Sequence, residues 1–473
     1  MDLLLKYSIF KNNYATTQAG AVLWMGVNGT IDYCNFTNNI ANGNHWAGGA
    51  VGWYGDYGLI NNSNFIENGA SNVNSGNAGD AGALAIFNCH VNIDNSLFSK
   101  NYASDKGGAL GVDSGAYVDI TNTIFKDNYM KKASGLESFG GAIYFYLSIN
   151  RAFIKNCSFI NNSASIYFYL SINRAFIKNC SFINNSASGN GGGIHTDSPL
   201  TILSSLFINN LAVGGPLLYS DNKKVNISDC IILNHTVPSA GSSIVTSITA
   251  NNNWWGNTLQ NKNVNPITNG KTTINNWYFL NIETNVLYLL KNDICNVTFA
   301  LDLFRRSDSS ITHRKLDNEL PKIFNYTVNM GNLSKSGLRS DNATYFLNGT
   351  GIVNITLISL GVKSYKLIYY IPEDSFTYLN LSLANATDIL NLTHDYKYYD
   401  EFDSAFLTNG IKIDKKITIQ GNNHTIDAKG KLRIFYVNAD NVTLNNLTLI
   451  NGHAANGGAI YWYGKNGLLT NSN

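Results

Sequence analysis

One segment of the chain is present twice in tandem. Residues Ile143–Ser165 recur without a single change as Ile166–Ser188, which places an additional 23 residues in the middle of the sequence. In an ordinary globular domain, such an insertion would split the core. A chain tolerates it if the segment is already one unit of a stack, because each unit of a solenoid contacts only its neighbours. The duplication therefore predicts a repeat architecture.

Two short motifs alternate through the first half of the chain. One is Phe-x-x-Asn, and the other is a corner of two small residues followed by an aliphatic residue. Phe-x-x-Asn begins at Phe10, Phe36, Phe65, Phe98, Phe125, Phe159, Phe182 and Phe207. The corner begins at Ala19, Gly48, Ala81, Gly107, Gly140 and Gly191. Most of the variation in spacing falls between the two motifs, which is typical of fixed strands with insertions at one edge.

Stacking these repeats in register predicts three ladders of equivalent side chains. The first is the buried Phe ladder, and a ladder of small side chains lies two residues before it: Ser8, Cys34, Ser63, Ser96, Thr123, Cys157, Cys180, Ser205 and Cys230. An Asn ladder lies three residues after the Phe: Asn13, Asn39, Asn68, Asn101, Asn128, Asn162, Asn185 and Asn210. Stacked Asn amides can hydrogen-bond from rung to rung. We therefore expect an all-β chain that begins as a parallel β-helix, right-handed by the crossover rule.

The repeat pattern fades after Ile244, and the sequence predicts three parts. Residues 1–282 form the β-helix, which Trp254, Trp255 and Trp277 cap; the alternative is that these tryptophans pack in an ordinary loop. Residues 283–371 have no Gly corners and alternate apolar with polar residues, which favours an immunoglobulin-like (Ig-like) β-sandwich. Residues 372–473 end in "GAIYWYGKNGLLTNSN", which matches "GAVGWYGDYGLINNSN" in the first helix. We expect them to be the first rungs of a second, truncated parallel β-helix.

The composition excludes some partners. Charged residues make up 14% of the chain and the net charge is +2, so nothing favours nucleic acid or an anionic membrane as a partner. No apolar run approaches the length of a membrane span. The start, "MDLLLKYSIF", has no apolar core typical of a signal peptide. The absence of a signal and of an anchor fits a fragment of a longer protein.

The alternating GGA(I/L/V) and Phe-x-x-Asn motifs resemble the repeats of the polymorphic membrane protein adhesins. With "NNWWG", "NNWY" and "ITIQGNNHTID", the wider pattern is similar to the adhesin-like surface proteins of methanogenic archaea. This resemblance implies a pectate-lyase-like β-helix, a secreted or cell-surface location, and a role in adhesion or as a stalk. Surface glycans or other cell-surface proteins are the expected partners.

A polysaccharide lyase or glycoside hydrolase is the alternative function, because such enzymes share this fold class. They need clustered carboxylates or an acid beside a basic partner. The best candidate pair is His195 and Asp197, which we expect to lie on the surface without a catalytic role. His424 and Asp427 are expected to be structural, and "YYDEFD" (residues 398–403) favours a solvated loop over a weak calcium site. We expect no catalytic residue, no cofactor and no metal.

Two further features bear on an exported protein. Four of the six cysteines occupy the ladder of small side chains, and Cys157 and Cys180 would stack one rung apart. A disulfide between them is geometrically conceivable, but buried thiols are the favoured interpretation. The chain also has about 21 Asn-x-Ser/Thr sequons, where on the order of ten would arise by chance, which gives modest support for a glycoprotein.

One set of tyrosines could bind a ligand. After the corners, inward residues such as Trp53, Phe145 and Phe168 alternate with outward tyrosines: Tyr54, Tyr144, Tyr146, Tyr167, Tyr169, Tyr461 and Tyr463. Exposed tyrosines along a flat sheet can stack on sugar rings or dock a protein. The alternative interpretation is ordinary stacking from rung to rung.

Overall fold

The computed structural model describes residues 3–43, 47–71, 81–104, 106–113, 115–131, 140–147, 149–169, 175–220, 223–234, 244–245, 248–259, 273–312, 325–333, 342–346 and 352–473. The chain divides into two compact units. One contains residues 1–280 and 301–321, and the other contains residues 281–300 and 322–473. The described residues are almost entirely β, and most of their strands pair in parallel as a solenoid.

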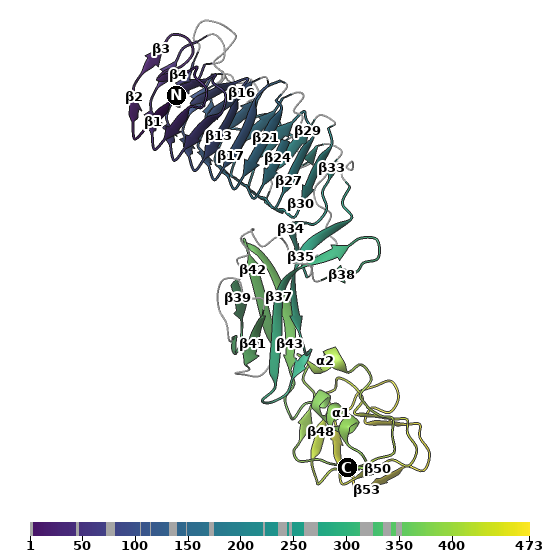
Figure 1. Cartoon of the computed structure of the whole chain (residues 1–473). Helices are drawn as coiled ribbons and strands as arrows, with labels where there is room; N and C mark the ends of the chain where they lie inside the picture. The colour runs from purple at the N-terminus through teal and green to yellow at the C-terminus, as the bar shows by residue number, and fades with distance from the viewer. Residues whose placement is uncertain are drawn as a thin grey trace. The chain divides into compact units, whose positions relative to one another are not determined.

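Successive turns of the first unit stack their strands in parallel sheets (Figure 1). The first sheet contains β1 (Leu4–Lys6), β5 (Thr30–Asp32), β9 (Gly58–Asn61), β13 (His90–Asp94), β17 (Tyr117–Thr121), β21 (Arg151–Lys155), β24 (Ala175–Lys178), β27 (Leu200–Leu203), β30 (Val225–Ser228) and β33 (Ile248–Thr249). The second sheet contains β2 (Ile9–Lys11), β6 (Asn35–Thr37), β10 (Asn64–Ile66), β14 (Leu97–Ser99), β18 (Ile124–Lys126), β22 (Ser158–Ile160), β25 (Ser181–Ile183), β28 (Leu206–Ile208), β31 (Ile231–Leu233), β34 (Asn253–Thr258) and β35 (Asn276–Thr284).

Two further sheets complete the turns. The third sheet contains β3 (Tyr14–Ala15), β7 (Ile40–Ala41), β11 (Gly69–Ala70), β15 (Tyr102–Ala103) and β19 (Tyr129–Met130). The fourth sheet contains β4 (Val22–Trp24), β8 (Val51–Trp53), β12 (Leu84–Phe87), β16 (Leu110–Asp113), β20 (Ile143–Phe145), β23 (Ile166–Phe168), β26 (Ile194–Thr196), β29 (Leu218–Ser220) and β32 (Ile244–Val245).

The second unit has antiparallel strands followed by parallel ones. β42 (Ile352–Ser359) pairs antiparallel with β39 (Asn325–Val328) and with β43 (Val362–Tyr370), and β36 (Tyr288–Leu289) joins β43 in parallel. β37 (Ile294–Arg305) pairs antiparallel with β41 (Asn342–Phe346), which pairs with β40 (Asn332–Leu333). In the first unit, the end of β37 pairs with β38 (Ile311–Thr312).

Parallel sheets form the remainder of the second unit. Their strands are β44 (Ile389–Asn391), β47 (Thr418–Gln420), β50 (Thr443–Asn445) and β53 (Leu468–Thr470); β45 (Tyr396–Lys397), β48 (Thr425–Asp427) and β51 (Thr448–Ile450); and β46 (Ile411–Ile413), β49 (Phe435–Val437) and β52 (Ile460–Trp462). Two helices accompany them among the described residues, α1 (Phe376–Asn385) and α2 (Asp403–Phe406). Phe376, Leu379 and Leu383 of α1 are buried in the core of these sheets. Helix α1 was not predicted from the sequence, although Ser375 caps it by accepting the Tyr378 N–H at 3.1 Å.

The Phe ladder is the spine of the first core. From Phe10 to Phe207, successive rings stack with centroids 4.6–5.0 Å apart. The rings from Phe36 onward are fully buried, and each contributes about 1.5–3 kcal/mol. The predicted Phe ladder is confirmed.

The Asn ladder is also confirmed, and its hydrogen bonds connect one turn to the next. Asn101 shows the pattern. Its Oδ1 accepts from the backbone N–H of Asn68 at 2.9 Å and from Asn68 Nδ2 at 3.1 Å. Its Nδ2 donates to the Phe65 carbonyl at 2.9 Å and to Asn128 Oδ1 at 3.1 Å. Each rung therefore completes the hydrogen bonds of its neighbour inside the core.

A second use of asparagine was not foreseen. The residue before each ladder Asn, or before each small ladder residue, often has a positive φ, as in Asn62 (48°), Asn122 (51°), Asn156 (55°) and Asn184 (55°). Asn enters this left-handed region more readily than most residues because its short polar side chain bonds locally. The frequent "NN", "NC" and "NS" pairs thus combine a tight bend with a ladder position.

The Gly corner is a point of close contact between turns. A Cβ on Gly49 would lie 1.9 Å from the Gly82 carbonyl oxygen, and a Cβ on Gly82 would lie 1.9 Å from that of Gly108. No side chain fits there.

The duplicated segment adds one turn in phase. Ile143, Tyr144 and Phe145 pair with Ile166, Tyr167 and Phe168 in identical register. Where the first copy lacks its Gly corner, Ala164 adopts φ 60°. A non-glycine residue pays roughly 1–2 kcal/mol for this conformation.

The three tryptophans that were expected to form a cap lie near the far end of the first stack, where Trp254 and Trp277 are buried and Trp255 is partly buried. Trp277 packs in the solenoid core with Phe304 at a ring distance of 5.2 Å, and Trp255 packs against that core. Trp254 is fully buried, and its indole N–H donates to the Asn257 carbonyl at 3.0 Å.

Candidate functional site

The candidate tyrosines of the first unit lie on the outer side of the fourth sheet. Phe145 and Phe168 point into the core, as expected. Tyr144 and Tyr167 point outward, yet only 1% and 6% of their surface is exposed. The prediction that these two tyrosines face a ligand in solution is therefore wrong. Strand alternation tells on which side of a sheet a residue lies, but not what covers that side.

The other tyrosines of this face are half-buried and stacked. Tyr54 stacks on Phe87 with centroids 4.5 Å apart, and Tyr146 stacks on Tyr169 at 5.6 Å. The planes within each pair differ by 4° and 9°, so one ring face of each residue is covered by its neighbour. Stacking from rung to rung describes these pairs. Burial, and then the charge of Asp113, raises the pKa of Tyr54.

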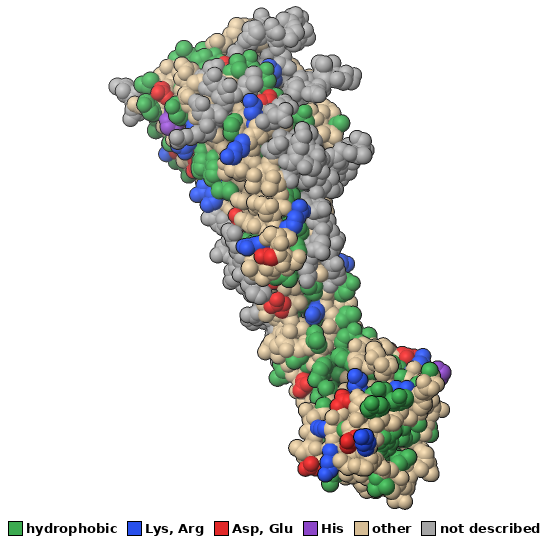
Figure 2. Space-filling model, turned by 90° about the vertical axis from the view of Figure 1, so that its right-hand side faces the viewer, with side chains coloured by type: hydrophobic (Ala, Val, Ile, Leu, Met, Phe, Trp, Pro, Cys, Tyr) green, Lys and Arg blue, Asp and Glu red, His purple; other side chains and the backbone are tan. Residues whose placement is uncertain are grey.

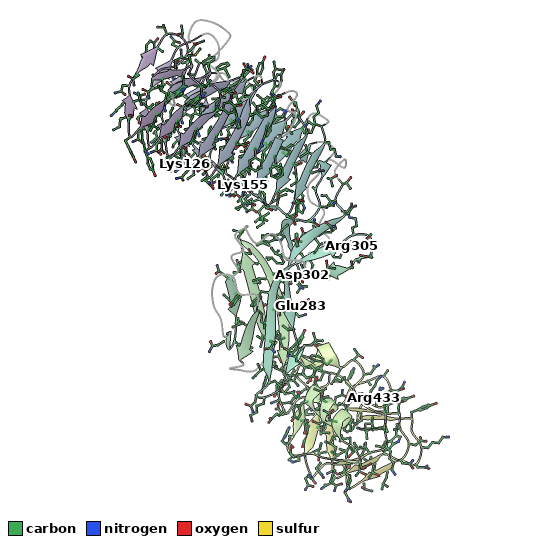
Figure 3. The ribbon with its side chains drawn as sticks, in the orientation of Figure 1. Lys126, Lys155, Glu283, Asp302, Arg305 and Arg433 are labelled. Carbon is green, nitrogen blue, oxygen red and sulfur yellow. The ribbon has the colours of Figure 1, made fainter. Side chains whose placement is uncertain are left out.

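The last two candidates lie in the second unit. Tyr461 stacks on Tyr436 at 5.2 Å, and the Arg433 guanidinium lies 5.0 Å from the Tyr461 ring and 5.4 Å from the Tyr436 ring (Figure 3). Tyr463 is 75% exposed. Tyr463 is the most accessible of the candidate tyrosines.

A buried polar cluster lies beside Tyr144. Tyr167, His195 and Tyr219 occupy the same position on β23, β26 and β29. The Tyr167 hydroxyl donates to Asp197 Oδ2 at 2.7 Å, and the His195 ring stacks on Tyr167 at 4.1 Å. His195 Nε2 lies 3.6 Å from Asp197 Oδ1, and both residues are buried. The expectation that His195 and Asp197 lie on the surface is wrong, because the sheet stacks His195 on Tyr167 and the Tyr167 hydroxyl binds Asp197.

The cluster combines acid, imidazole and phenol but leaves little room for a substrate. Burial raises the pKa of Tyr167, and the hydrogen bond to the Asp197 carboxylate raises it further. Tyr167 is therefore a neutral donor at ordinary pH. A polymer would have to contact His195 or Asp197 for acid–base catalysis, and their exposed fractions of 7% and 6% do not admit one.

A cation completes this side of the sheet. Lys106 Nζ lies 5.4 Å from the centre of the Tyr144 ring and 5.2 Å from that of Tyr146. These distances are those of cation–π contacts. Around β20, β23 and β26, the outer side of the fourth sheet is thus a packed aromatic layer with buried polar groups, and its contacts stabilise the stack.

The other sequence candidates have structural partners. His424 Nδ1 lies 3.2 Å from Asp395 Oδ1, whereas Asp427 pairs with Lys429 at 2.8 Å. Asp403, in the "YYDEFD" segment, is fully buried and accepts the backbone N–H groups of Thr377 and Tyr399, each at 2.8 Å. The expected solvated loop is therefore correct only in part: Asp400 and Glu401 are exposed, whereas Asp403 is buried because it binds the N-terminal turn of α1.

The described residues contain neither a cluster of metal ligands nor a disulfide. No group of three or more His, Cys, Asp or Glu side chains in that part could hold a metal ion. All six cysteines are buried free thiols. The Cys157 backbone N–H donates to Cys180 Sγ at 3.4 Å, and burial raises the pKa of Cys180. The favoured prediction of buried thiols at the small ladder is confirmed.

Charged side chains are scattered among uncharged ones on the face shown in Figure 2, as the 14% charged fraction suggests. Within the described chain, no helix has both the length and the apolar character needed to cross a membrane.

Known proteins offer limited matches. The family model of the Chlamydia polymorphic membrane protein repeat matches residues 179–197, which end at Asp197. No curated protein matches the chain. The solved structure of the PL6 family alginate lyase AlyGC aligns with 100% of this chain and 76% of its own, at 10% identity and a TM-score of 0.24. This score is too low to support an argument about activity. The chain therefore contains a stretch similar to a surface-protein repeat within an all-β, mostly parallel solenoid.

Proposed function

We propose that this chain is part of a non-enzymatic, adhesin-like or stalk protein of the cell surface that binds glycans or partner surfaces. One observation supports this most directly. The residues that match the polymorphic membrane protein repeat lie within one turn of the stack, and Phe182 and Asn185 among them belong to the ladders that run from Phe10 to Phe207 and from Asn13 to Asn210. The residues that recur are those that hold one turn to the next.

The proposal includes the domain organisation. We propose that residues 1–282 form a capped β-helix, that the antiparallel strands of 283–371 form an Ig-like spacer, and that 372–473 begin a second β-helix. The resemblance to adhesin-like surface proteins of methanogenic archaea supports this order. An extracellular location also accounts for the many sequons. Asn161 and Asn184 are sequon residues with exposed side chains at successive turns. A mass increase on peptides containing them, in protein from its natural source, would support glycosylation.

A binding assay paired with a cleavage assay tests the function. The full chain is applied to a glycan array and to intact cells, and is incubated with polysaccharides whose reducing ends are counted. We expect retention on glycans or cells without new reducing ends. Tyr463→Ser, at the exposed candidate tyrosine, tests whether the second unit contributes to retention. Cleavage by the wild-type chain would overturn the non-enzymatic part of the proposal.

A β-helix polysaccharide lyase or glycoside hydrolase is the second candidate. It is favoured by one observation, the contact of His195 and Asp197 with Tyr167. If the chain cleaves a polysaccharide and His195→Ala abolishes this without changing the circular dichroism spectrum, the enzyme replaces the adhesin. The burial of both residues argues against this outcome.

A further inference from the structure

The outer side of the first sheet differs from that of the fourth. Alternate residues of β21 are buried, and the residues between them, Arg151, Phe153 and Lys155, point away from the core. The second copy presents Phe176 and Lys178 in the same way on β24. The equivalent of Arg151 in that copy, Arg174, lies outside the described residues. We call Arg151, Phe153, Lys155, Phe176 and Lys178 the cationic patch.

The two copies place like groups one turn apart. Phe153 pairs in register with Phe176, and Lys155 with Lys178. The Phe rings stack with centroids 5.4 Å apart and planes 3° from parallel, and they form an apolar ridge beside the lysines. Neighbouring strands of a sheet lie about 4.8 Å apart. Lys155 lies along the outer edge of the stack in Figure 3. The duplication has therefore placed two outward-facing lysines in register, one turn apart.

The patch has an excess of positive charge. Arg151 Nε forms an ion pair with Asp119 Oδ1 at 2.9 Å. Neither Lys155 nor Lys178 has a carboxylate partner among the described residues. Three cations less one carboxylate give +2, which equals the formal net charge of the entire 473-residue chain. Two adjacent ammonium groups repel one another, and an anion placed between them would relieve this repulsion.

We propose that the cationic patch binds a linear anionic glycan, whose successive sugars bear carboxylate or sulfate groups, lying across the turns. This inference rests on the proposed function and names its ligand class. The lysine pair would bind anions on the polymer, and the Phe ridge would contact the apolar side of the sugars. The arrangement suits nucleic acid less well. The two Phe rings cover one another, and the Arg151 guanidinium lies 5.2 Å from the Phe153 ring, so few ring faces are left on which successive bases could stack.

The test measures binding of the full chain to four polymers by calorimetry. Polygalacturonate supplies carboxylates, dextran sulfate supplies sulfates, dextran is the neutral glycan, and polyuridylate is the nucleic acid. We expect binding to at least one anionic glycan, which about 1 M NaCl abolishes because the screening length falls to about 3 Å. Lys155→Gln with Lys178→Gln should weaken this binding about tenfold or more.

A matched variant separates the patch from net charge. Lys11→Gln with Lys126→Gln removes the same two charges from the last residues of β2 and β18 in the second sheet, where the lysines are not on neighbouring strands. Its affinity should stay within about twofold of wild type. Equal losses in the two variants would overturn the proposal, as would tighter binding to polyuridylate. Binding to dextran alone would overturn the patch and leave the proposed function intact. Binding to no glycan and to no cell would remove both.

Discussion

Replacing Asn101 by Ala should show how much stability one ladder amide contributes. Asn101 is fully buried. Its removal leaves the Asn68 backbone N–H, Asn68 Nδ2 and the Phe65 carbonyl without their bonds of 2.9, 3.1 and 2.9 Å. Each orphaned buried group costs about 1–3 kcal/mol. Allowing for some relaxation, we expect the free energy of unfolding to fall by about 4 kcal/mol.

Urea unfolding of the full chain, followed by hydrogen exchange measured peptide by peptide, provides the assay. Exchange separates the first unit from the second, so the two need not unfold together. The control is Asn64→Ala, which breaks one partly exposed bond of 2.8 Å from Asn64 Nδ2 to Asn35 Oδ1 and should cost about 1 kcal/mol or less. A loss for Asn101→Ala no greater than that for Asn64→Ala would refute the view that the amide ladder holds the turns together.

Three further results are expected. Deleting Ile166–Ser188 should preserve the β-sheet circular dichroism spectrum and nearly the same melting temperature, because the copy is in phase and the strained φ of Ala164 would no longer be needed; aggregation would contradict this. The raised pKa of Tyr167 favours the neutral phenol in the fold, so its contribution to stability is complete below the unfolded pKa near 10 and is lost as pH rises above it. Tyr167→Phe should therefore flatten the alkaline decline in melting temperature, and an unchanged decline would contradict the assignment. Asp403→Ala should destabilise the second unit by about 3 kcal/mol in urea unfolding, since it orphans the buried N–H groups of Phe376 and Thr377 at the start of α1. Asp403→Asn, which keeps an acceptor, should lose less.

The sequence predicted the features of the fold that recur from one turn to the next. Equivalents of Phe98 and Asn101 recur at a fixed offset in the successive turns from Phe10 to Phe207, and an in-register parallel stack converts such an offset directly into a contact between neighbours. Register, ladders, buried thiols and the phase of the duplication all follow from that one geometric rule.

The sequence could not show which outward side chains of a sheet are covered by other parts of the protein. Tyr144 and Tyr117 are both outward residues by alternation, yet Tyr144 is buried and Tyr117 is exposed. That difference depends on tertiary cover, which does not recur with the strands. The buried position of His195 was missed for the same reason. Helix α1 was missed because a single amphipathic segment among many β-repeats gives a weak signal, although Ser375 followed by Phe376, Leu379 and Leu383 has the spacing of a capped helix.

The core packs in the same way whatever the number of turns, and this has a consequence for evolution. Phe159 stacks on Phe182, and Phe182 stacks on Phe207. Without the second copy, Phe207 would take the place of Phe182 beside Phe159, so the packing of the core does not depend on the number of copies. The surface does depend on the number of copies, because every copy lengthens the stack by about 4.8 Å and adds its own charged residues one turn further along. A single duplication thus changes both the length of the stack and the number of charged groups along its surface, while the packing of the core stays the same.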